Sequence, residues 1–164
     1  MKEEKIVLSL NVSSTEELAD KDLCLRNAAI DAAKNAYAPY SGFSVGVAVL
    51  LENGTIVKGN NQENAVYPSG LCAERVALFS VGASYPDMPV VSIAIIALKG
   101  DDILSSISPC GGCRQVMLET EQRYGRPVRV LLCGNNETVI VDSAKDLLPL
   151  CFGKDNLFYD TTLF

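Results

Sequence analysis

The sequence contains no histidine, and this absence limits the chemistry that the chain can perform. It excludes the Ser-His-Asp and Cys-His arrangements by which many hydrolases activate a nucleophile. Any zinc site must instead be built from cysteine, aspartate or glutamate side chains. Proton transfer near neutral pH must also depend on another group, such as a carboxyl group whose pKa is shifted by its surroundings.

Basic residues are outnumbered by acidic ones. The chain has 14 lysines and arginines against 20 aspartates and glutamates, which gives a formal net charge of −6 at pH 7. Binding to polynucleotides draws much of its free energy from the counterions that cationic side chains release. An acidic chain gains little from that effect, so the composition favours a small, weakly charged substrate over a nucleic acid partner.

Long apolar runs are missing, and the apolar segments are too short to span a lipid bilayer. The charged residues at positions 1–5 are not followed by the apolar core of a signal peptide. We therefore expect a cytoplasmic protein with no membrane partner. In that reducing compartment, cysteines bind metals, take part in catalysis or pack in the core more often than they form disulfides.

The length of 164 residues and the hydrophobic fraction of 48% predict one domain with a substantial core. A capping pair, Ser14 and Glu17, predicts a helix that continues to about Tyr37, before Pro39 ends it. Apolar patterns and turn residues predict strands at 44–51, 55–59, 90–98, 128–133 and 138–141, and helices at 72–82, 110–124 and 143–148. This order predicts an α/β fold with a five-stranded sheet flanked by helices.

Two cysteine clusters, at residues 72–75 (Cys-Ala-Glu-Arg) and 109–113 (Pro-Cys-Gly-Gly-Cys), each precede a helical pattern. The thiols of Cys72, Cys110 and Cys113 are therefore expected at two helix N-termini, where the helix dipole and free backbone N–H groups lower the pKa of a thiol. Cys110 and Cys113 are three residues apart and lie on the same side of one helical turn. Three such sulfurs predict a site for one Zn²⁺ ion, with a fourth position open to water.

Other interpretations of these cysteines are open. A lone Cys-x-x-Cys pair also occurs in redox proteins and structural zinc sites, and cysteine is often simply buried. Here a third cysteine stands two residues before Glu74, and Cys-x-Glu followed by Pro-Cys-x-x-Cys is the three-cysteine form of the zinc deaminase signature. The remaining cysteines lie in apolar patterns and are expected in the core: Cys24, Cys133 and Cys151.

Over residues 25–152 the chain resembles the short-form, homotetrameric, zinc-dependent cytidine deaminases. The matching segments are 36–41 (Ala-Tyr-Ala-Pro-Tyr-Ser), 43–46 (Phe-Ser-Val-Gly), 61–65 (Asn-Gln-Glu-Asn-Ala), 72–75, 108–116 and 148–149, together with Phe152. Segments 43–46 and 61–65 narrow the match to deaminases of free nucleosides. The resemblance implies a three-layer fold with a mixed sheet, one Zn²⁺ per chain, a pyrimidine nucleoside as partner, and a homotetramer. We expect an extension at 1–14, one deaminase domain at 15–153 and a tail at 154–164.

The resemblance also implies roles for the cysteine clusters. Cys72, Cys110 and Cys113 hold the zinc, and Glu74 carries protons from water to the ring nitrogen N3 and to the leaving amine. A zinc-bound hydroxide attacks C4 of cytidine or deoxycytidine, which yields uridine or deoxyuridine and ammonia, as in pyrimidine salvage. Because three thiolates leave negative charge at the metal, Arg75 is the candidate to donate hydrogen bonds to the sulfurs and offset it.

For the substrate, the resemblance implies that Phe43 stacks on the pyrimidine ring. Asn61 and Glu63 hydrogen-bond the ribose hydroxyl groups, and backbone groups of Ala73 and Ser108 contact the edge of the base. On composition alone, Phe43 would instead be a core residue, and the two polar side chains would belong to a solvated loop.

Two further residues, Tyr67 and Phe152, resemble positions that reach the site of a neighbouring subunit. Three other functions compete with this interpretation. They are a related zinc deaminase of another nucleoside or nucleoside antibiotic, a polynucleotide editing enzyme, and a non-catalytic structural zinc protein. The acidic composition and the lack of a Lys/Arg-rich arm disfavour polynucleotide editing.

Overall fold

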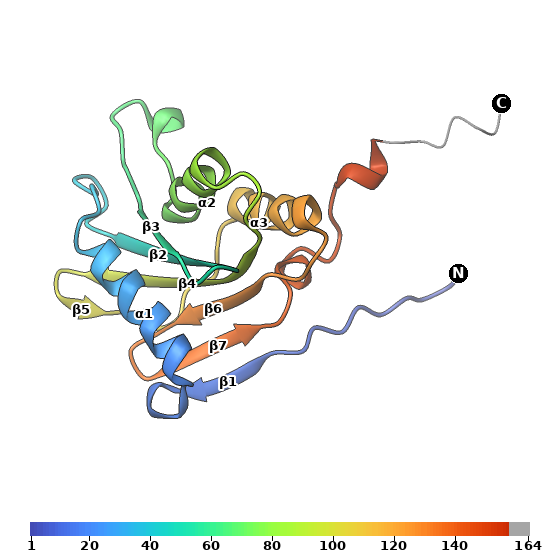
Figure 1. The fold of residues 1–164 in the computed structure, drawn as a ribbon, viewed down its shortest axis with the longest axis horizontal. Helices are drawn as coiled ribbons and strands as arrows, with labels where there is room; N and C mark the ends of the chain where they lie inside the picture. The colour runs from blue at the N-terminus through green and yellow to red at the C-terminus, as the bar shows by residue number, and fades with distance from the viewer. Residues whose placement is uncertain (158–164) are drawn as a thin grey trace.

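A single mixed β-sheet, covered by helices on both faces, forms the centre of the computed structural model, which describes residues 1–157 (Figure 1). The strands are β1 (Asn11–Ser14), β2 (Ser44–Leu51), β3 (Ile56–Asn60), β4 (Val90–Lys99), β5 (Asp102–Ile103), β6 (Arg129–Cys133) and β7 (Glu137–Val141). The helices are α1 (Asp20–Ala33), α2 (Ala73–Ser84) and α3 (Gly111–Tyr124).

The strands are ordered β1-β7-β6-β4-β2-β3, and β5 pairs with the end of β4. Strand β4 runs parallel to β6 and antiparallel to β2. Its nearly continuous apolar sequence is buried on both faces, as expected for a central strand. The prediction of an α/β fold is confirmed, but the predicted five strands are too few, because the sheet has seven within residues 1–157.

The two additional strands were hard to detect in the sequence. Strand β5 has two residues, and β1 has the sequence Asn-Val-Ser-Ser, in which polar side chains dominate. Strand β1 forms because its backbone pairs with β7, from Asn11 opposite Ile140 to Ser14 opposite Glu137. That pairing depends on a partner more than 120 residues away, so local sequence carries little sign of it.

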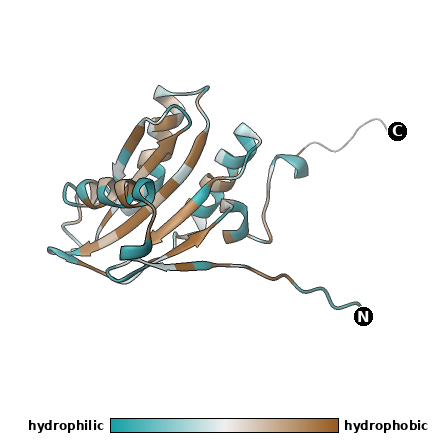
Figure 2. Ribbon diagram, turned by 60° about the horizontal axis from the view of Figure 1, so that its bottom comes forward, coloured by the Kyte–Doolittle hydropathy of each residue, from teal (hydrophilic) through white to brown (hydrophobic). Residues whose placement is uncertain are grey.

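Helix α1 covers one face of the sheet, and α2 and α3 cover the other (Figure 1). Figure 2 shows the hydrophobic strands between these two layers. The core on the α1 side includes Leu25, Ala29, Ala48, Ile96 and Leu131. The core on the other side includes Ala77, Val81, Met117, Val47 and Ile95.

Helix α1 is shorter than predicted at both ends. Ser14 and Glu17 do form a capping pair, in which the Glu17 carboxylate accepts hydrogen bonds from the Ser14 N–H and hydroxyl, but they cap only the 3₁₀ turn Thr15–Glu17. The chain is extended at Leu18, whose side chain is buried, and the helix begins at Asp20. It ends at Ala33, because the backbone N–H and carbonyl groups of Tyr37 form hydrogen bonds with the backbone of residues 61 and 63 and so are not available to continue the helix.

The close packing of α1 on β2 depends on Gly46. A Cβ atom at this position would overlap the carbonyl oxygen of Ala29 and the amide nitrogen of Ala33. We expect Gly46→Ala to lower the free energy of unfolding by about 3 kcal/mol, because neither backbone can move without disturbing the helix–sheet contact. Urea unfolding measures the change. Gly82→Ala in α2 is the control: its added methyl group would meet only the end of the Arg123 side chain, so no loss is expected, and an equal loss in both variants would contradict the argument.

The other predicted elements agree with the structure within a few residues. Asn53-Gly54 connects β2 and β3 in a hairpin, and Gly125, at φ 64°, ends α3 in the left-handed conformation. The predicted helix at 143–148 is a 3₁₀ turn, Ala144–Leu147. Of the tail predicted at 154–164, residues 158–164 lie outside the described residues. Across residues 1–157, no helix has both the length and the apolar content that crossing a membrane requires.

Candidate metal centre and substrate pocket

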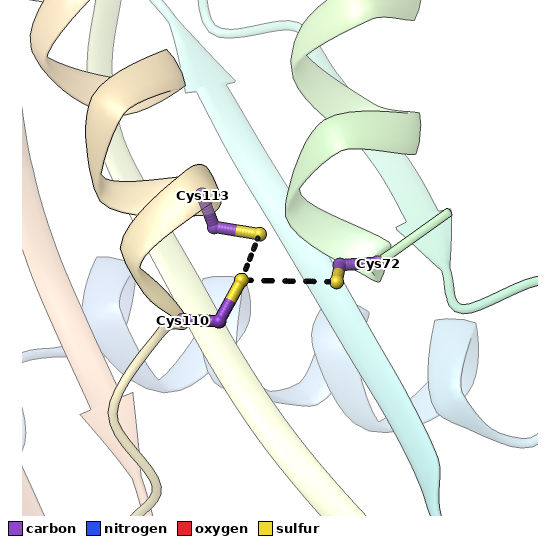
Figure 3. Close-up of side chains that lie close together, drawn as sticks. All are labelled: Cys72, Cys110 and Cys113. Atoms are coloured by element: carbon purple, nitrogen blue, oxygen red, sulfur yellow. Dashed lines mark hydrogen bonds between the residues drawn. The ribbon is translucent and has the colours of Figure 1, made fainter. Parts of the chain in front are cut away.

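Three thiols converge where α2 and α3 begin. Cys72 is the N-cap residue of α2, Cys110 is the N-cap residue of α3, and Cys113 lies in the first turn of α3. The sulfur of Cys110 lies 3.9 Å from that of Cys72 and 3.4 Å from that of Cys113. All three sulfur atoms lie within 4.8 Å of one another and point toward a common centre (Figure 3).

This spacing fits a metal ion better than a disulfide. Two bonded sulfurs lie about 2.05 Å apart, whereas tetrahedral Zn–S bonds of about 2.3 Å separate two sulfurs by about 3.8 Å. All six cysteines of the chain are free thiols, and the cluster of three offers the soft sulfur donors that zinc prefers. With three protein ligands, the fourth position of a tetrahedral ion stays open, as in catalytic zinc sites.

The electrostatic surroundings of the thiols differ from one another. Burial opposes ionisation of Cys110, but hydrogen bonds from the Cys113 backbone N–H and from the neighbouring thiols outweigh it and lower the pKa of Cys110. Burial and the nearby Glu74 carboxylate raise the pKa of Cys113. A cation at the centre of the cluster would favour the thiolate form of all three side chains.

Glu74 lies in the first turn of α2, and only 5% of its surface is exposed. Burial raises the pKa of its carboxyl group, and its own backbone N–H and the neighbouring Cys113 side chain oppose part of this shift. The sequence therefore places a carboxyl group of shifted pKa directly beside the sulfur cluster. Such a group can accept and return protons closer to neutral pH than an exposed glutamate can.

Arg75 follows Glu74 in the chain and contacts the sulfur cluster at Cys72. Its Nη2 donates to the sulfur of Cys72 over 3.8 Å, and this contact raises the pKa of the guanidinium group. Its Nε is buried and has no hydrogen-bond partner among the described residues. The positive charge lies where it offsets the negative charge of thiolates.

We expect Arg75→Gln to weaken metal retention or lower turnover by on the order of 10-fold to 100-fold without unfolding the protein. The reason is that the variant loses the cation that stabilises the Cys72 thiolate. Zinc content after dialysis, kcat and the thermal midpoint are the measurements. Wild-type zinc content together with wild-type kcat would remove Arg75 from the metal centre.

A pocket of about 510 Å³ adjoins the sulfur cluster, and this volume suits a small molecule of nucleoside size. Its wall includes Cys72, one of the three clustered cysteines, and Arg75, which contacts the sulfur of Cys72. The remaining lining residues come from the loops before β2 and after β3: Tyr40, Ser41, Asn61, Gln62, Glu63, Asn64, Tyr67, Gly70 and Leu71.

Two polar side chains of the pocket, those of Glu63 and Asn61, are held in place by hydrogen bonds with residues 40–45. The Glu63 carboxylate accepts hydrogen bonds from the Ser41 hydroxyl (2.5 Å) and from the backbone N–H groups of Tyr40 (2.9 Å) and Ser41 (3.3 Å). The Ser41 hydroxyl and the Tyr40 N–H are the main causes that lower the pKa of Glu63. Asn61 accepts from the Val45 N–H (2.7 Å) and donates to the Phe43 carbonyl (2.9 Å).

Tyr40 and Ser41 are pocket residues to which sequence reasoning gave no role. The Tyr40 ring packs edge-on against that of Tyr67, with 6.3 Å between centroids, and Ser41 orients Glu63. Their occurrence in the matching segment 36–41 was the available signal.

Several other predicted residues, including Glu74, Cys110 and Cys113, are not among the residues that line the pocket. Phe43 is half-buried, Ala73 is fully buried behind Cys72, and Ser108 is exposed just before Pro109. Phe152 is 60% exposed, and its carbonyl oxygen accepts a hydrogen bond from Gln115. The prediction of core thiols holds for Cys133 but is wrong for Cys24, whose position in α1 is exposed, and Cys151 is only half-buried. Helix α1 turns its apolar side inward with Leu25, which directs the preceding cysteine toward solvent.

Comparison with known protein families identifies the family to which the chain belongs. The family model described as the cytidine and deoxycytidylate deaminase zinc-binding region matches residues 20–125, which include all three clustered cysteines and Glu74. The chain belongs to this family. A cytidine deaminase of Mycobacterium tuberculosis is 40% identical over 139 residues, which cover 81% of this chain and 90% of that protein.

Two further family members show the same likeness. A cytidine deaminase of Halalkalibacterium halodurans is 44% identical over 100 residues, covering 61% of this chain and 71% of that protein. The crystal structure of cytidine deaminase from Burkholderia pseudomallei superposes with a TM-score of 0.68 at 40% identity, covering 79% of this chain and 98% of that one. The deaminase fold thus extends over most of the chain.

Proposed function

We propose that this protein hydrolytically deaminates cytidine and deoxycytidine to uridine and deoxyuridine, releasing ammonia, in pyrimidine salvage. The observation that carries the proposal is the burial of Glu74 beside three clustered thiols, one of which, that of Cys72, lines a nucleoside-sized pocket. An acid/base group and a metal-binding donor set are then adjacent to a substrate cavity, which is what the reaction requires.

Cys72, Cys110 and Cys113 would hold one Zn²⁺ ion per chain. When bound in such a set, zinc lowers the pKa of water at its open position toward about 7 and so supplies a nucleophile at neutral pH. The arginine hydrogen bond to Cys72 offsets part of the thiolate charge that would otherwise weaken this effect.

Glu74 performs the proton transfers. Its carboxylate accepts a proton from the attacking water and delivers it to N3 of the pyrimidine, which makes C4 more electrophilic. It then takes the proton of the new hydroxyl group on C4 and passes it to the exocyclic amine, so that C4=O forms, the C4–N bond breaks and ammonia leaves. The raised pKa of Glu74 suits these transfers, because it lies closer to neutral pH than that of an exposed glutamate, so the group can both accept and release a proton there.

Substrate binding is assigned to residues around the pocket. Asn61 and Glu63 line it, and the lowered pKa of Glu63 keeps a charged acceptor available for a ribose hydroxyl. The hydrogen bond from Asn61 to the Phe43 carbonyl links the ribose end to the ring proposed to stack on the base. The backbone groups of Ala73 and Ser108 would contact the edge of the base.

The assembly proposed for the protein is a homotetramer. Tyr67 and Phe152 are 77% and 60% exposed, which suits side chains that reach a neighbouring subunit's site. Light scattering coupled to size-exclusion chromatography tests the subunit number. A monomer with full activity would exclude the cross-subunit roles of both residues.

We further propose that residues 15–153 form the catalytic domain. Residues 1–14 are an N-terminal extension whose last four residues add β1 to the sheet, and residues 154–164 are a tail. The six free thiols suit a reducing compartment, and we place the protein in the cytoplasm with no nucleic acid or membrane partner.

The test is a uridine-formation assay on protein whose zinc content has been measured. A panel of nucleosides, nucleoside antibiotics and free bases, followed by ammonia release, separates cytidine deamination from a related zinc deaminase activity. Release from cytidine and deoxycytidine supports the proposal. Zinc-loaded protein that releases ammonia from none of them would point instead to a structural zinc protein.

A further inference from the structure

Arg114 connects the turn that carries two of the thiols to the C-terminal part of the chain. Its Nε donates to the carbonyl oxygen of Pro109 over 2.8 Å, and its Nη1 donates to the carbonyl oxygen of Leu147 over 2.9 Å. Pro109 directly precedes Cys110, and Arg114 directly follows Cys113. The side chain of Arg114 therefore links the residue after the turn to the residue before it.

Two residues of the turn, Gly111 and Gly112, add nothing that would fix it. Gly111 and Gly112 contribute no side chains, and a Cβ on either would have no other heavy atom within 4 Å among the described residues. Pro109 has no N–H group to donate. The Arg114 backbone N–H bonds the Cys110 carbonyl over 3.0 Å, as the first bond of α3. The orientation of the exposed Cys110 thus depends strongly on the Arg114 side chain.

The opposite end of the connection is firmly held. Leu147 ends a 3₁₀ turn whose start is bound to α3 through Glu121, a buried carboxylate. Glu121 accepts hydrogen bonds from the Ser143 hydroxyl (2.9 Å) and from the Lys145 N–H (3.2 Å). The Leu147 carbonyl is therefore a fixed reference point from which Arg114 positions the turn.

The geometry points to Arg114 as a positioning residue of the metal centre, which holds the Cys110 sulfur in place for zinc. This inference rests on the proposed zinc-dependent function. Arg75 contacts a sulfur directly, whereas Arg114 acts through the carbonyl that precedes Cys110. A guanidinium group suits this role because its rigid fork directs N–H groups to two acceptors at once, which the single ammonium group of lysine does not match.

The experiment compares Arg114→Gln and Arg114→Lys with a matched control, Arg123→Gln. Arg123 is also on α3 and also donates to a proline carbonyl, that of Pro86, but the helix carries it away from the thiols. Zinc-loaded proteins are mixed with a chromogenic chelator, and the rate of zinc release is followed. We expect release from Arg114→Gln to be on the order of 10-fold to 100-fold faster than from wild type, with Arg114→Lys between them and Arg123→Gln unchanged.

The visible spectrum of the cobalt-substituted proteins gives a second measurement, because its bands report the geometry of the sulfur ligands. We expect altered bands in Arg114→Gln and wild-type bands in Arg123→Gln. With cytidine as substrate, kcat should fall in Arg114→Gln while KM stays unchanged, since Arg114 is not among the residues that line the pocket.

Wild-type release rate and wild-type cobalt bands in Arg114→Gln would overturn the inference, even if its thermal midpoint fell. If that variant does not fold, Arg114→Lys decides alone, and zinc release at the wild-type rate overturns it. Failure of the proposed function has a different result: wild-type protein would hold zinc but deaminate no nucleoside, and the release rates would still decide the role of Arg114. Wild-type protein that binds no zinc would overturn both.

Discussion

Replacing Glu74 with alanine or glutamine is expected to lower kcat for cytidine by about 10³- to 10⁴-fold while the protein keeps its zinc. Glu74 is the buried carboxyl group in contact with the thiol cluster, and it is proposed to move a proton in two successive steps. Without it, water must act as both base and acid. The cysteines are unchanged in these variants, so metal binding should persist. Steady-state kinetics and zinc analysis on the same preparation measure the two effects separately.

The glutamine variant distinguishes proton transfer from shape, because it keeps the size of the side chain and its capacity for hydrogen bonding but removes the exchangeable carboxyl proton. Glu119→Gln, at an exposed position of α3, is the matched control and should keep wild-type kcat. Retained activity in Glu74→Gln would reject the assigned role. Loss of zinc together with activity would instead make Glu74 part of the metal-binding structure.

The parts of the fold that sequence reasoning predicted are those with a local cause. Strand β4 is apolar along nearly its whole length, and Asn53-Gly54 fits the tight turn between β2 and β3. The parts that it missed depend on distant partners. The helix predicted from Ser14 ends as a single 3₁₀ turn because Leu18 is drawn into the core, and β1 exists because β7 offers it a free edge.

The same distinction applies to the site. The spacing of Cys110 and Cys113 and their place at a helix start follow from local sequence, and their meeting with Cys72 follows from two neighbouring β-α units. The supporting contacts do not follow from spacing. Ser41 reaches Glu63 across a loop, and the arginine after Cys113 bonds a carbonyl 33 residues away. Such hydrogen bonds are set by the tertiary fold, so a single sequence gives no pattern from which to read them.

Removing one sulfur ligand is expected to have the other large effect. Cys110→Ser should lose zinc during dialysis, and its deaminase activity should fall below detection, because serine does not supply the soft thiolate donor that zinc prefers. Cys110 is exposed, so the substitution leaves no cavity and the fold should persist. Cys24→Ser, at an exposed cysteine of α1, is the matched control and should keep both zinc and activity. The measurements are zinc per chain, kcat and far-ultraviolet circular dichroism.

Metal removal from the wild-type protein completes this test. A strong chelator should abolish activity, and added zinc should restore it to the wild type but not to Cys110→Ser, which has two of the three sulfurs. The thermal midpoint of the chelated wild type should also fall, because zinc bound between α2 and α3 stabilises the folded state by its binding free energy. A Cys110→Ser protein with one zinc per chain and wild-type kcat would show that the ion is held elsewhere, and the role of the three clustered thiols would have to be abandoned.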